Sequence, residues 1–296
     1  LGPNPAFYGG TVGPVANRTD RAEVPLDGTV YHLAHNDGPD LANNNHTDAE
    51  RGLHKRLWDA VVDDGANTVR MSCRLADGEL GLPGNRTFSA SFSLAADGAA
   101  HVLTVAYGCE TDAPTYVSMT NHTYMNLAGH DAGPVLGEVV VAEADSFLPL
   151  RPDCVSAGEV RPVANTPFDF RSPRVLGDAV DADDEQIKIG RGYDHCMCIR
   201  GWEPGAAPRP ALHVVEPVSG RTLDVLVTTP GAHLYTGNWL GDEGAKDGAS
   251  YAPRDGLAFE PEFYPDNIHH PEWPQAVWGP DRPYAQTIVY RFSTVG

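Results

Sequence analysis

Four short segments of this sequence gather polar, titratable and aromatic side chains between apolar neighbours. They are Asn17-Arg18, Asn121 through Leu127, Gly192 through His195, and Phe259 through Glu262. In an extended segment, His122, Tyr124 and Asn126 share one face. Such a face is costly to bury without hydrogen-bond partners, and it offers several donors and acceptors in one place. The segments therefore point to a site for a ligand that carries many hydroxyl groups.

Each candidate residue also has an ordinary structural explanation. A lone histidine such as His122 is most often a core residue bonded to a nearby carbonyl, but its Asn, Thr and Tyr neighbours favour a ligand site here. Glu260 could be a surface carboxylate in an ion pair, and Asp194 could close a turn. For these two residues, both explanations stay open at the level of single residues.

The charge of the chain narrows the class of ligand. The 296 residues include 21 Lys and Arg against 40 Asp and Glu, a net charge of −19. This field repels phosphate backbones, anionic membranes and sugar phosphates. We therefore expect a neutral small molecule as the partner, with no nucleic acid and no membrane.

The five cysteines and the short apolar runs indicate in which cellular compartment the protein is expected. The cysteines are few and odd in number, and Cys196 and Cys198 stand too close in an extended segment to bridge easily. No apolar run is long enough to span a bilayer, and the first residues lack the features of a signal peptide. We therefore expect a cytoplasmic protein. The His269-His270 pair lacks a third ligand at conventional spacing, so no metal site is expected there.

The elements that position these residues read as strands. Apolar and polar residues alternate along Val69 to Leu75, along Phe88 to Leu94 and along Leu103 to Tyr107, which is the pattern of a strand with one solvated face. Asp97-Gly98 separates the last two runs. This spacing predicts a hairpin over residues 87–108.

Further strand signals recur along the chain, at Glu138 to Ala142, Leu212 to Val215, Leu223 to Val227 and Thr287 to Phe292. The chain also holds 31 Gly and 25 Pro and shows no sustained helical stripe. We therefore expect one all-β domain over residues 1–296, a large antiparallel β-sandwich with few short helices. Loop-like stretches at 36–52, 150–185 and 242–256 are long for simple connections, and loops of that length usually either carry function or lack regular structure.

The motifs occur together in an order that resembles the aldose 1-epimerase (galactose mutarotase) family. They are Gly13 through Arg18, Gly52 through Trp58, Asn121 through Leu127, Pro162 through Arg171, Gly192 through His195, Pro230 through Asn238, Phe259-Glu260 leading to Tyr264-Pro265-Asp266, and Tyr290 through Ser293. Each motif is weak alone, but their joint order along nearly the whole chain is highly specific.

The resemblance implies a galactose mutarotase-like β-sandwich whose concave face binds a free aldose and interconverts its α and β anomers. It implies an isomerase without a metal or an organic cofactor, acting on galactose or glucose as a monomer or homodimer. By the family pattern, Glu260 is the general base, His122 the general acid, and His46 a second histidine near the ring oxygen. The substrate-binding residues that it implies are Asn17, Arg18, Tyr124, Asp194 and His233.

These roles agree with the chemistry of ring opening. A hemiacetal opens when a proton leaves O1 while another reaches the ring oxygen, so a carboxylate and an imidazolium on opposite sides of the sugar are suitable partners. Rotation about C1–C2 then exposes the other face of the aldehyde. We expect the carboxylates of Glu260 and Asp194 to favour the charged form of His122.

The chain departs from the family pattern at several positions. The stretch before Gly52 lacks the usual Leu-His-Gly-Gly, so His54 competes with His46 for the second histidine role. His233 stands where many members have Gln. Because the first shared motif begins close to Leu1, we expect the leading strands of the fold to be missing.

Three other functions stay open at this stage. The altered loop around His46 suggests a non-catalytic sugar-binding or regulatory module. A hexose-phosphate epimerase would need a basic cluster, for which only Arg18 is a clear candidate. A glycoside hydrolase could pair Glu260 with Asp194 as its two carboxylates.

Overall fold

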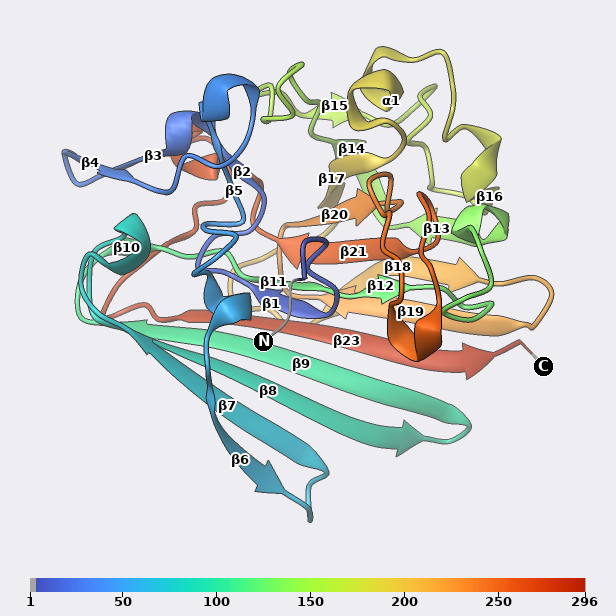
Figure 1. The fold of residues 1–296 in the computed structure, drawn as a ribbon, viewed down its shortest axis with the longest axis horizontal. Helices are drawn as coiled ribbons and strands as arrows, with labels where there is room; N and C mark the ends of the chain where they lie inside the picture. The colour runs from blue at the N-terminus through green and yellow to red at the C-terminus, as the bar shows by residue number, and fades with distance from the viewer. Residues whose placement is uncertain (1–3, 296) are drawn as a thin grey trace.

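Two large antiparallel sheets dominate the computed structural model, which describes residues 4–295 (Figure 1). The larger sheet has nine strands in the order β16 (Arg174–Val175), β13 (Val139–Ala142), β18 (Arg209–Val215), β19 (Arg221–Val227), β23 (Tyr284–Thr294), β9 (Ala100–Thr111), β8 (Arg86–Asp97), β7 (Thr68–Leu75) and β6 (Asp59–Asp63). The smaller sheet has six strands in the order β12 (Tyr124–Met125), β21 (Leu257–Glu262), β20 (Gly231–Tyr235), β17 (Asp194–Ile199), β14 (Ala144–Phe147) and β15 (Arg161–Pro162). The all-β sandwich expected from the sequence is confirmed.

Short strand pairs and turns complete the chain that the structure describes. The pairs are β1 (Gly10–Val12) with β11 (Thr120–His122), β2 (Arg18–Thr19) with β5 (Asn44–Asn45), β3 (Glu23–Leu26) with β4 (Thr29–His32), and β10 (Thr115–Tyr116) with β22 (Val277–Trp278). The α-helix is α1 (Glu185–Gly190), and the 3-10 turns are η1 (Asp20–Ala22), η2 (Pro39–Leu41), η3 (Leu53–Lys55), η4 (Glu79–Gly81), η5 (Val135–Gly137), η6 (Leu176–Asp178), η7 (Lys246–Gly248) and η8 (Asn267–His269).

The predicted hairpin over residues 87–108 is confirmed. Strands β8 and β9 pair over their whole length, from Arg86 opposite Thr111 to Asp97 opposite Ala100. Gly98 in the connecting turn has a φ of 60°, a left-handed conformation that glycine adopts at no steric cost. The other strands expected from alternation are also present, as β7, β13, β18, β19 and β23.

Strands β17, β20 and β21 lack a solvated face. The alternation of apolar and polar residues that marks a half-exposed strand therefore did not reveal them. Every residue in these three strands is buried. One face packs into the core between the two sheets, through residues such as Met197, Leu234 and Phe259. The opposite face is buried as well, because the segments that carry Asn17, Arg18 and His46 contact it. The Asn17 amide donates to Glu262, and Arg18 and His46 line one cavity with Asp194 and Glu260.

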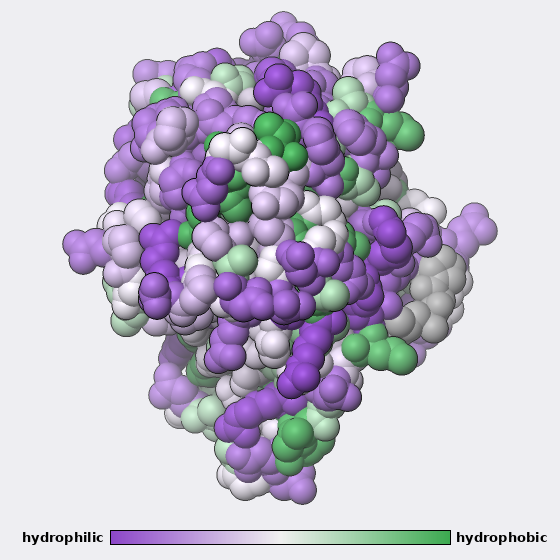
Figure 2. All heavy atoms as spheres, turned by 90° about the vertical axis from the view of Figure 1, so that its left-hand side faces the viewer, coloured by the Kyte–Doolittle hydropathy of each residue, from purple (hydrophilic) through white to green (hydrophobic). Residues whose placement is uncertain are grey.

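The loops expected at 36–52, 150–185 and 242–256 contain only short elements such as β5, β15, β16, η2, η6 and η7. None of the helices in residues 4–295 is long and apolar enough to cross a membrane. The face shown in Figure 2 is mostly hydrophilic, with hydrophobic residues in small scattered groups.

Candidate active site

The register of the six-stranded sheet gathers the site residues on one face. Asp194 on β17 lies opposite Tyr235 on β20, Tyr235 lies opposite Ala258 on β21, and Ala258 lies opposite Tyr124 on β12. Residues directly opposite in an antiparallel pair point to the same face of the sheet. Asp194, Tyr235 and Tyr124 therefore form one row across the sheet, with the small Ala258 between the two tyrosines.

A second row runs parallel to the first. Cys196 lies opposite His233, and His233 lies opposite Glu260. Because side chains alternate along a strand, this row lies on the same face as Asp194 and Tyr235. Glu262, two residues after Glu260, also belongs to this face. Four titratable side chains, Asp194, His233, Glu260 and Glu262, are thus brought together from three buried strands.

The segments that cover this face complete a cavity of about 310 Å³. It is lined by Pro5, Ala6, Phe7, Asn17, Arg18, Asn45, His46, His122, Tyr124, Asp194, Tyr235, Trp239, Leu240, Gly241, Asp242 and Glu260. Seven of the eight residues that sequence reasoning assigned to the site are in this lining. The eighth, His233, is buried behind it. His54 is also outside the lining, so His46 is the one of these two histidines that faces the cavity.

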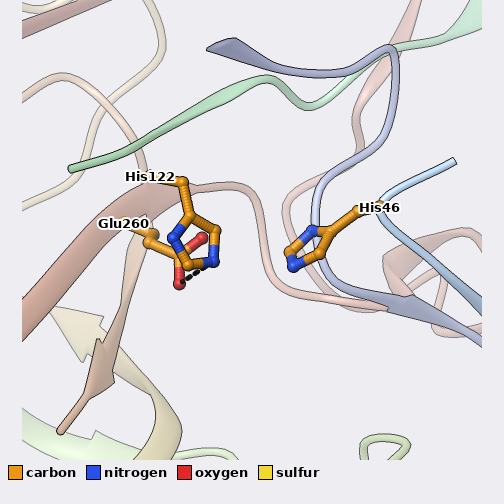
Figure 3. A group of neighbouring side chains, drawn as sticks. All are labelled: His46, His122 and Glu260. Carbon is orange, nitrogen blue, oxygen red and sulfur yellow. Dashed lines mark ion pairs between the residues drawn. The ribbon is translucent and has the colours of Figure 1, made fainter. Parts of the chain in front are cut away.

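Glu260 and His122 form a close buried pair. The Nε2 atom of His122 lies 3.5 Å from Oε1 of Glu260, and their side chains are 6% and 2% exposed (Figure 3). The sequence-based expectation set the two groups on opposite sides of the sugar. Instead they lie side by side in one wall of the cavity.

Burial decides the protonation of this pair. It lowers the pKa of His122 to about 4 and raises the pKa of Glu260 to about 8, because both charged forms lose hydration. Burial outweighs the charge of Asp194, which favours the charged form of His122 as expected, so His122 is neutral in the free protein near pH 7. Between these values the pair holds one proton.

His46 is held in one neutral tautomer. Its Nδ1 accepts a hydrogen bond from the backbone N–H of Asn17 at 3.0 Å, so the ring proton of the neutral form is on Nε2. Burial, followed by the charge of His122, holds the pKa of His46 well below its usual value. Asn17 and His46 both have left-handed backbones, with φ of 56° and 54°, and such strain often marks functional positions. His46 thus supplies a neutral N–H donor.

The same fixed tautomer bears on metal binding. One ligand atom from each of His46, His122 and Glu260 lies within 4.8 Å of the others (Figure 3). A cation would need the lone pair of a histidine nitrogen. With Nδ1 of His46 engaged by the Asn17 N–H, Nε2 carries a proton, and freeing it would break that hydrogen bond. The arrangement therefore suits hydrogen bonding and proton transfer better than metal coordination.

Arg18 also lines the cavity. Its Nε donates to Oδ2 of Asp37 at 3.0 Å. Burial by itself would lower the pKa of Arg18, but the charges of Asp194 and Asp37 raise it overall. Arg18 is therefore a fixed cation whose charge is already balanced by carboxylates.

His233 contacts two carboxylates instead of the cavity. Its Nε2 lies 2.9 Å from Oδ1 of Asp194, and its Nδ1 lies 3.4 Å from Oε1 of Glu262. Glu262 also accepts a hydrogen bond from the amide of Asn17 at 2.8 Å. His233 was expected to bind hydroxyls directly, but its place in the structure is behind Asp194.

Sequence reasoning missed part of the cavity wall. The ring of Phe7 lies 4.8 Å from that of His46 and 5.8 Å from that of His122, between centroids. The neighbouring Tyr8 donates a hydrogen bond to Asp242 at 2.6 Å, which ties the first segment to the 242–256 loop. Local sequence contains no signal for such long-range contacts. Tyr235, by contrast, could have been found, because it shares a face with His233 in any extended segment.

Comparison with known proteins shows a consistent relationship over the chain. Residues 1–291 match the family model described as aldose 1-epimerase. The bovine galactose mutarotase is 35% identical over 289 residues, which cover 97% of this chain and 79% of that protein. The Escherichia coli aldose 1-epimerase is 33% identical, with 97% and 80% covered.

Solved structures agree. An aldose epimerase homologue from C. elegans superimposes with a TM-score of 0.84 at 29% identity, covering 99% of this chain and 84% of that one. A galactose 1-epimerase from Lactobacillus acidophilus superimposes with a TM-score of 0.80 at 25% identity, covering 98% and 81%.

Proposed function

The chain belongs to the aldose 1-epimerase family of isomerases, and from this premise we propose that it interconverts the α and β anomers of a free aldohexose, galactose or glucose. The observation that carries the proposal is the buried Glu260–His122 pair, 3.5 Å apart, in a cavity that Arg18 and Asp194 also line. The pair offers an acid and a base, and the other two residues offer hydrogen bonds to hydroxyls.

The separation of Glu260 and His122 suits the proposed reaction. O1 and the ring oxygen are both bonded to C1, so two groups 3.5 Å apart can contact them at the same time. In the free protein the single proton of the pair is on Glu260, so it first moves to His122 across their 3.5 Å contact. Glu260 then takes the proton of O1 as the C1–ring oxygen bond breaks, and His122 delivers its proton to the ring oxygen. After rotation about C1–C2 the two transfers run in reverse, and the other anomer forms.

The proton count of the pair sets the pH range of this reaction. One proton must be shared, so that one group can give while the other takes. Below about pH 4 the pair gains a second proton and loses its base, and above about pH 8 it loses its proton and its acid. We expect a bell-shaped pH profile of kcat with limbs near these values. A profile that stays flat from pH 5 to 10 would contradict this assignment.

The remaining side chains bind and orient the sugar in this proposal. The Nε2–H of His46 donates toward the ring oxygen, and Arg18, Asp194, Asn17 and Tyr124 bind hydroxyls. Among the cavity-lining residues in the described part of the chain, Arg18 is the one Lys or Arg side chain, and Asp37 already pairs with it. This charge balance favours a neutral hexose over a hexose phosphate.

Polarimetry tests the proposal directly. Fresh α-galactose or α-glucose should approach its equilibrium rotation faster with the protein than in buffer or with the Glu260→Gln variant. No acceleration by folded protein would overturn the proposal. If calorimetry then detected sugar binding, the chain would be a non-catalytic sugar-binding module. Release of the chromophore from a nitrophenyl glycoside would instead indicate hydrolysis.

A further inference from the structure

His233 lies where a histidine has an unusual pair of neighbours. It is 2% exposed, and each of its ring nitrogens faces a carboxylate: Asp194 at 2.9 Å and Glu262 at 3.4 Å. A neutral imidazole has one N–H donor and one acceptor, so it would turn a lone pair toward one of the two carboxylates. Only the doubly protonated ring presents an N–H to both carboxylates: Nε2 is hydrogen-bonded to Asp194, and Nδ1 lies in ion-pair range of Glu262 without meeting hydrogen-bond geometry. The geometry therefore favours the imidazolium, and both carboxylates favour its charge.

We propose that His233 is a buried imidazolium, clamped between Asp194 and Glu262, that acts as a positioning residue for anomer exchange. It orients Asp194 toward the sugar and supplies a fixed positive charge beside Glu260. This inference rests on the proposed function, since the charge matters through the Glu260–His122 pair. It gives His233 a role different from direct contact with a hydroxyl group.

The sheet register explains how the charge reaches Glu260. His233 and Glu260 are directly opposite on β20 and β21, and their side chains leave the same face of the sheet. Directly opposite residues of an antiparallel pair have Cβ atoms about 4.5–5.5 Å apart. Both residues are out of solvent, so water screens their interaction little. In agreement with this, the carboxylates raise the pKa of His233 to about 10 although its burial opposes the charge.

Groups from several elements surround these residues. Those around His233 are Arg18 on β2, Asp194, His195 and Cys196 on β17, and Glu260 and Glu262 on β21. The Glu260–His122 pair also faces His46 after β5, His54 in η3, Tyr124 on β12, Tyr235 on β20 and Tyr290 on β23. Burial keeps His46, His195, Cys196 and these tyrosines neutral near pH 7, since it lowers the pKa of the two histidines and raises that of the thiol and the tyrosines.

The fixed charges near the pair are then few. Arg18 and His233 are positive, and Asp194 is negative. Burial raises the pKa of Glu262, and the His233 charge opposes that rise and favours the carboxylate. The pair itself, with its single proton, is neutral overall. Loss of the His233 charge would leave an excess of negative charge beside the pair, which would hold its protons more tightly. Loss of the Glu262 charge would act in the opposite direction.

Two charge-changing variants with opposite expected signs test the proposal. His233→Gln keeps a donor toward Asp194 but removes the charge, and it should move both limbs of the pH profile of kcat upward by about one pH unit. One unit above the wild-type alkaline limb, this variant should retain roughly half of its own maximum where the wild type retains roughly a tenth. Glu262→Gln should move both limbs downward, and the double variant should return them toward the wild-type positions.

The control is a histidine–carboxylate pair outside the site. His213 on β18 lies 2.6 Å from Asp224 on β19, and both side chains are partly exposed. His213→Gln should leave the pH profile unchanged. If His233→Gln and Glu262→Gln shifted the limbs in the same direction, or not at all, His233 would be a purely structural residue and the proposal would be overturned.

A measurement without substrate separates this inference from the proposed function. In protein labelled with 15N in its histidine rings, one ring should keep both nitrogens protonated from pH 6 to 9, and its signals should be absent in His233→Gln. A neutral tautomer of His233 at pH 7 would overturn the inference even if the enzyme is active. A persistent imidazolium in a protein without mutarotase activity would refute the proposed function and confine the inference to the charge state. If His233→Gln does not fold, two results still test the inference. They are the downward shift of the pH limbs in Glu262→Gln and the doubly protonated histidine ring in the wild-type spectrum.

Discussion

The two large sheets of this protein differ in how much of each strand is exposed to solvent. In the nine-stranded sheet, the buried residues of strands such as β7 and β8 are separated by half-buried or exposed ones, and the last residues of β8 are exposed. In the six-stranded sheet, β17, β20 and β21 are buried on both faces, and the face away from the core carries Asp194, His233 and Glu260. Both sheets contribute to the core, and the six-stranded sheet also places titratable groups where water screens them little.

Two histidine–aspartate pairs make the difference concrete. His213–Asp224 on the nine-stranded sheet and His233–Asp194 on the six-stranded sheet have similar separations, 2.6 and 2.9 Å. The side chain of His213 is 44% exposed and that of His233 is 3% exposed. Exposed pairs contribute little to stability, while removal of one partner from a buried pair is strongly destabilising. Equal distances therefore do not imply equal roles.

The largest expected effect comes from the buried acid–base pair. Glu260→Gln should lower kcat by on the order of 10²–10⁴-fold in the polarimetric assay, because it removes a positioned proton-transfer group. Glu138, just before β13, is a matched control: it is also buried, its pKa is raised by burial to about 7, and it is outside the lining of the cavity. Glu138→Gln should leave kcat within about twofold, because it touches no reacting group. Similar losses in both variants would mean that burial of charge, and not chemistry, explains the result.

The next effect concerns the core face of the nine-stranded sheet. Phe88 on β8 is fully buried, so Phe88→Ala should lower the free energy of unfolding by about 3–5 kcal/mol in denaturant titrations. Val62 on β6 is 65% exposed, and Val62→Ala should change it by less than about 0.5 kcal/mol. Equal losses would contradict the assignment of the two faces.

A smaller effect should appear in the pH dependence of stability. The folded pKa of His233, about 10, is above its unfolded value, so its stabilisation is complete below about pH 6.5 and is lost as the pH rises through about 10. The difference in unfolding free energy between wild type and His233→Gln should therefore shrink by at least about 1 kcal/mol between these pH values. Denaturant titrations at both pH values measure it. A constant difference would mean that His233 has no raised pKa.

The smallest effect is expected at the exposed pair. His213→Gln should change the free energy of unfolding by less than about 1 kcal/mol, because solvent screens the pair. The same denaturant titration, repeated in 1 M salt, should show little further change. A loss comparable to that of His233→Gln would remove the distinction between the two sheets.

The sequence predicted strands best where the alternation of apolar and polar residues matches a buried face and a solvated face. The hairpin of β8 and β9 followed from alternation around Asp97-Gly98, because one face of each strand meets the core and the other meets water. Strands β17, β20 and β21 gave no such signal, since both of their faces are buried. Their residues were found through motifs instead, as with Asp194 and Glu260.

The protonation states were beyond sequence reasoning for a different reason. Whether His122 is charged depends on the balance between burial and the nearby carboxylates, and burial outweighs them in the folded chain. The contact of Phe7 with His46 and His122 likewise joins residues far apart in the chain, so no local pattern encodes it.

The amino-acid sequence by itself determined the all-β class, most strands of the nine-stranded sheet and the family, because strand periodicity and ordered motifs are local properties of the chain. Only the tertiary structure decided that His46 and not His54 faces the cavity, that His233 lies between two carboxylates, and that Glu260 and His122 form a close buried pair. Those facts depend on which groups lose water and which charges become neighbours, and both are set by the packing of the whole chain.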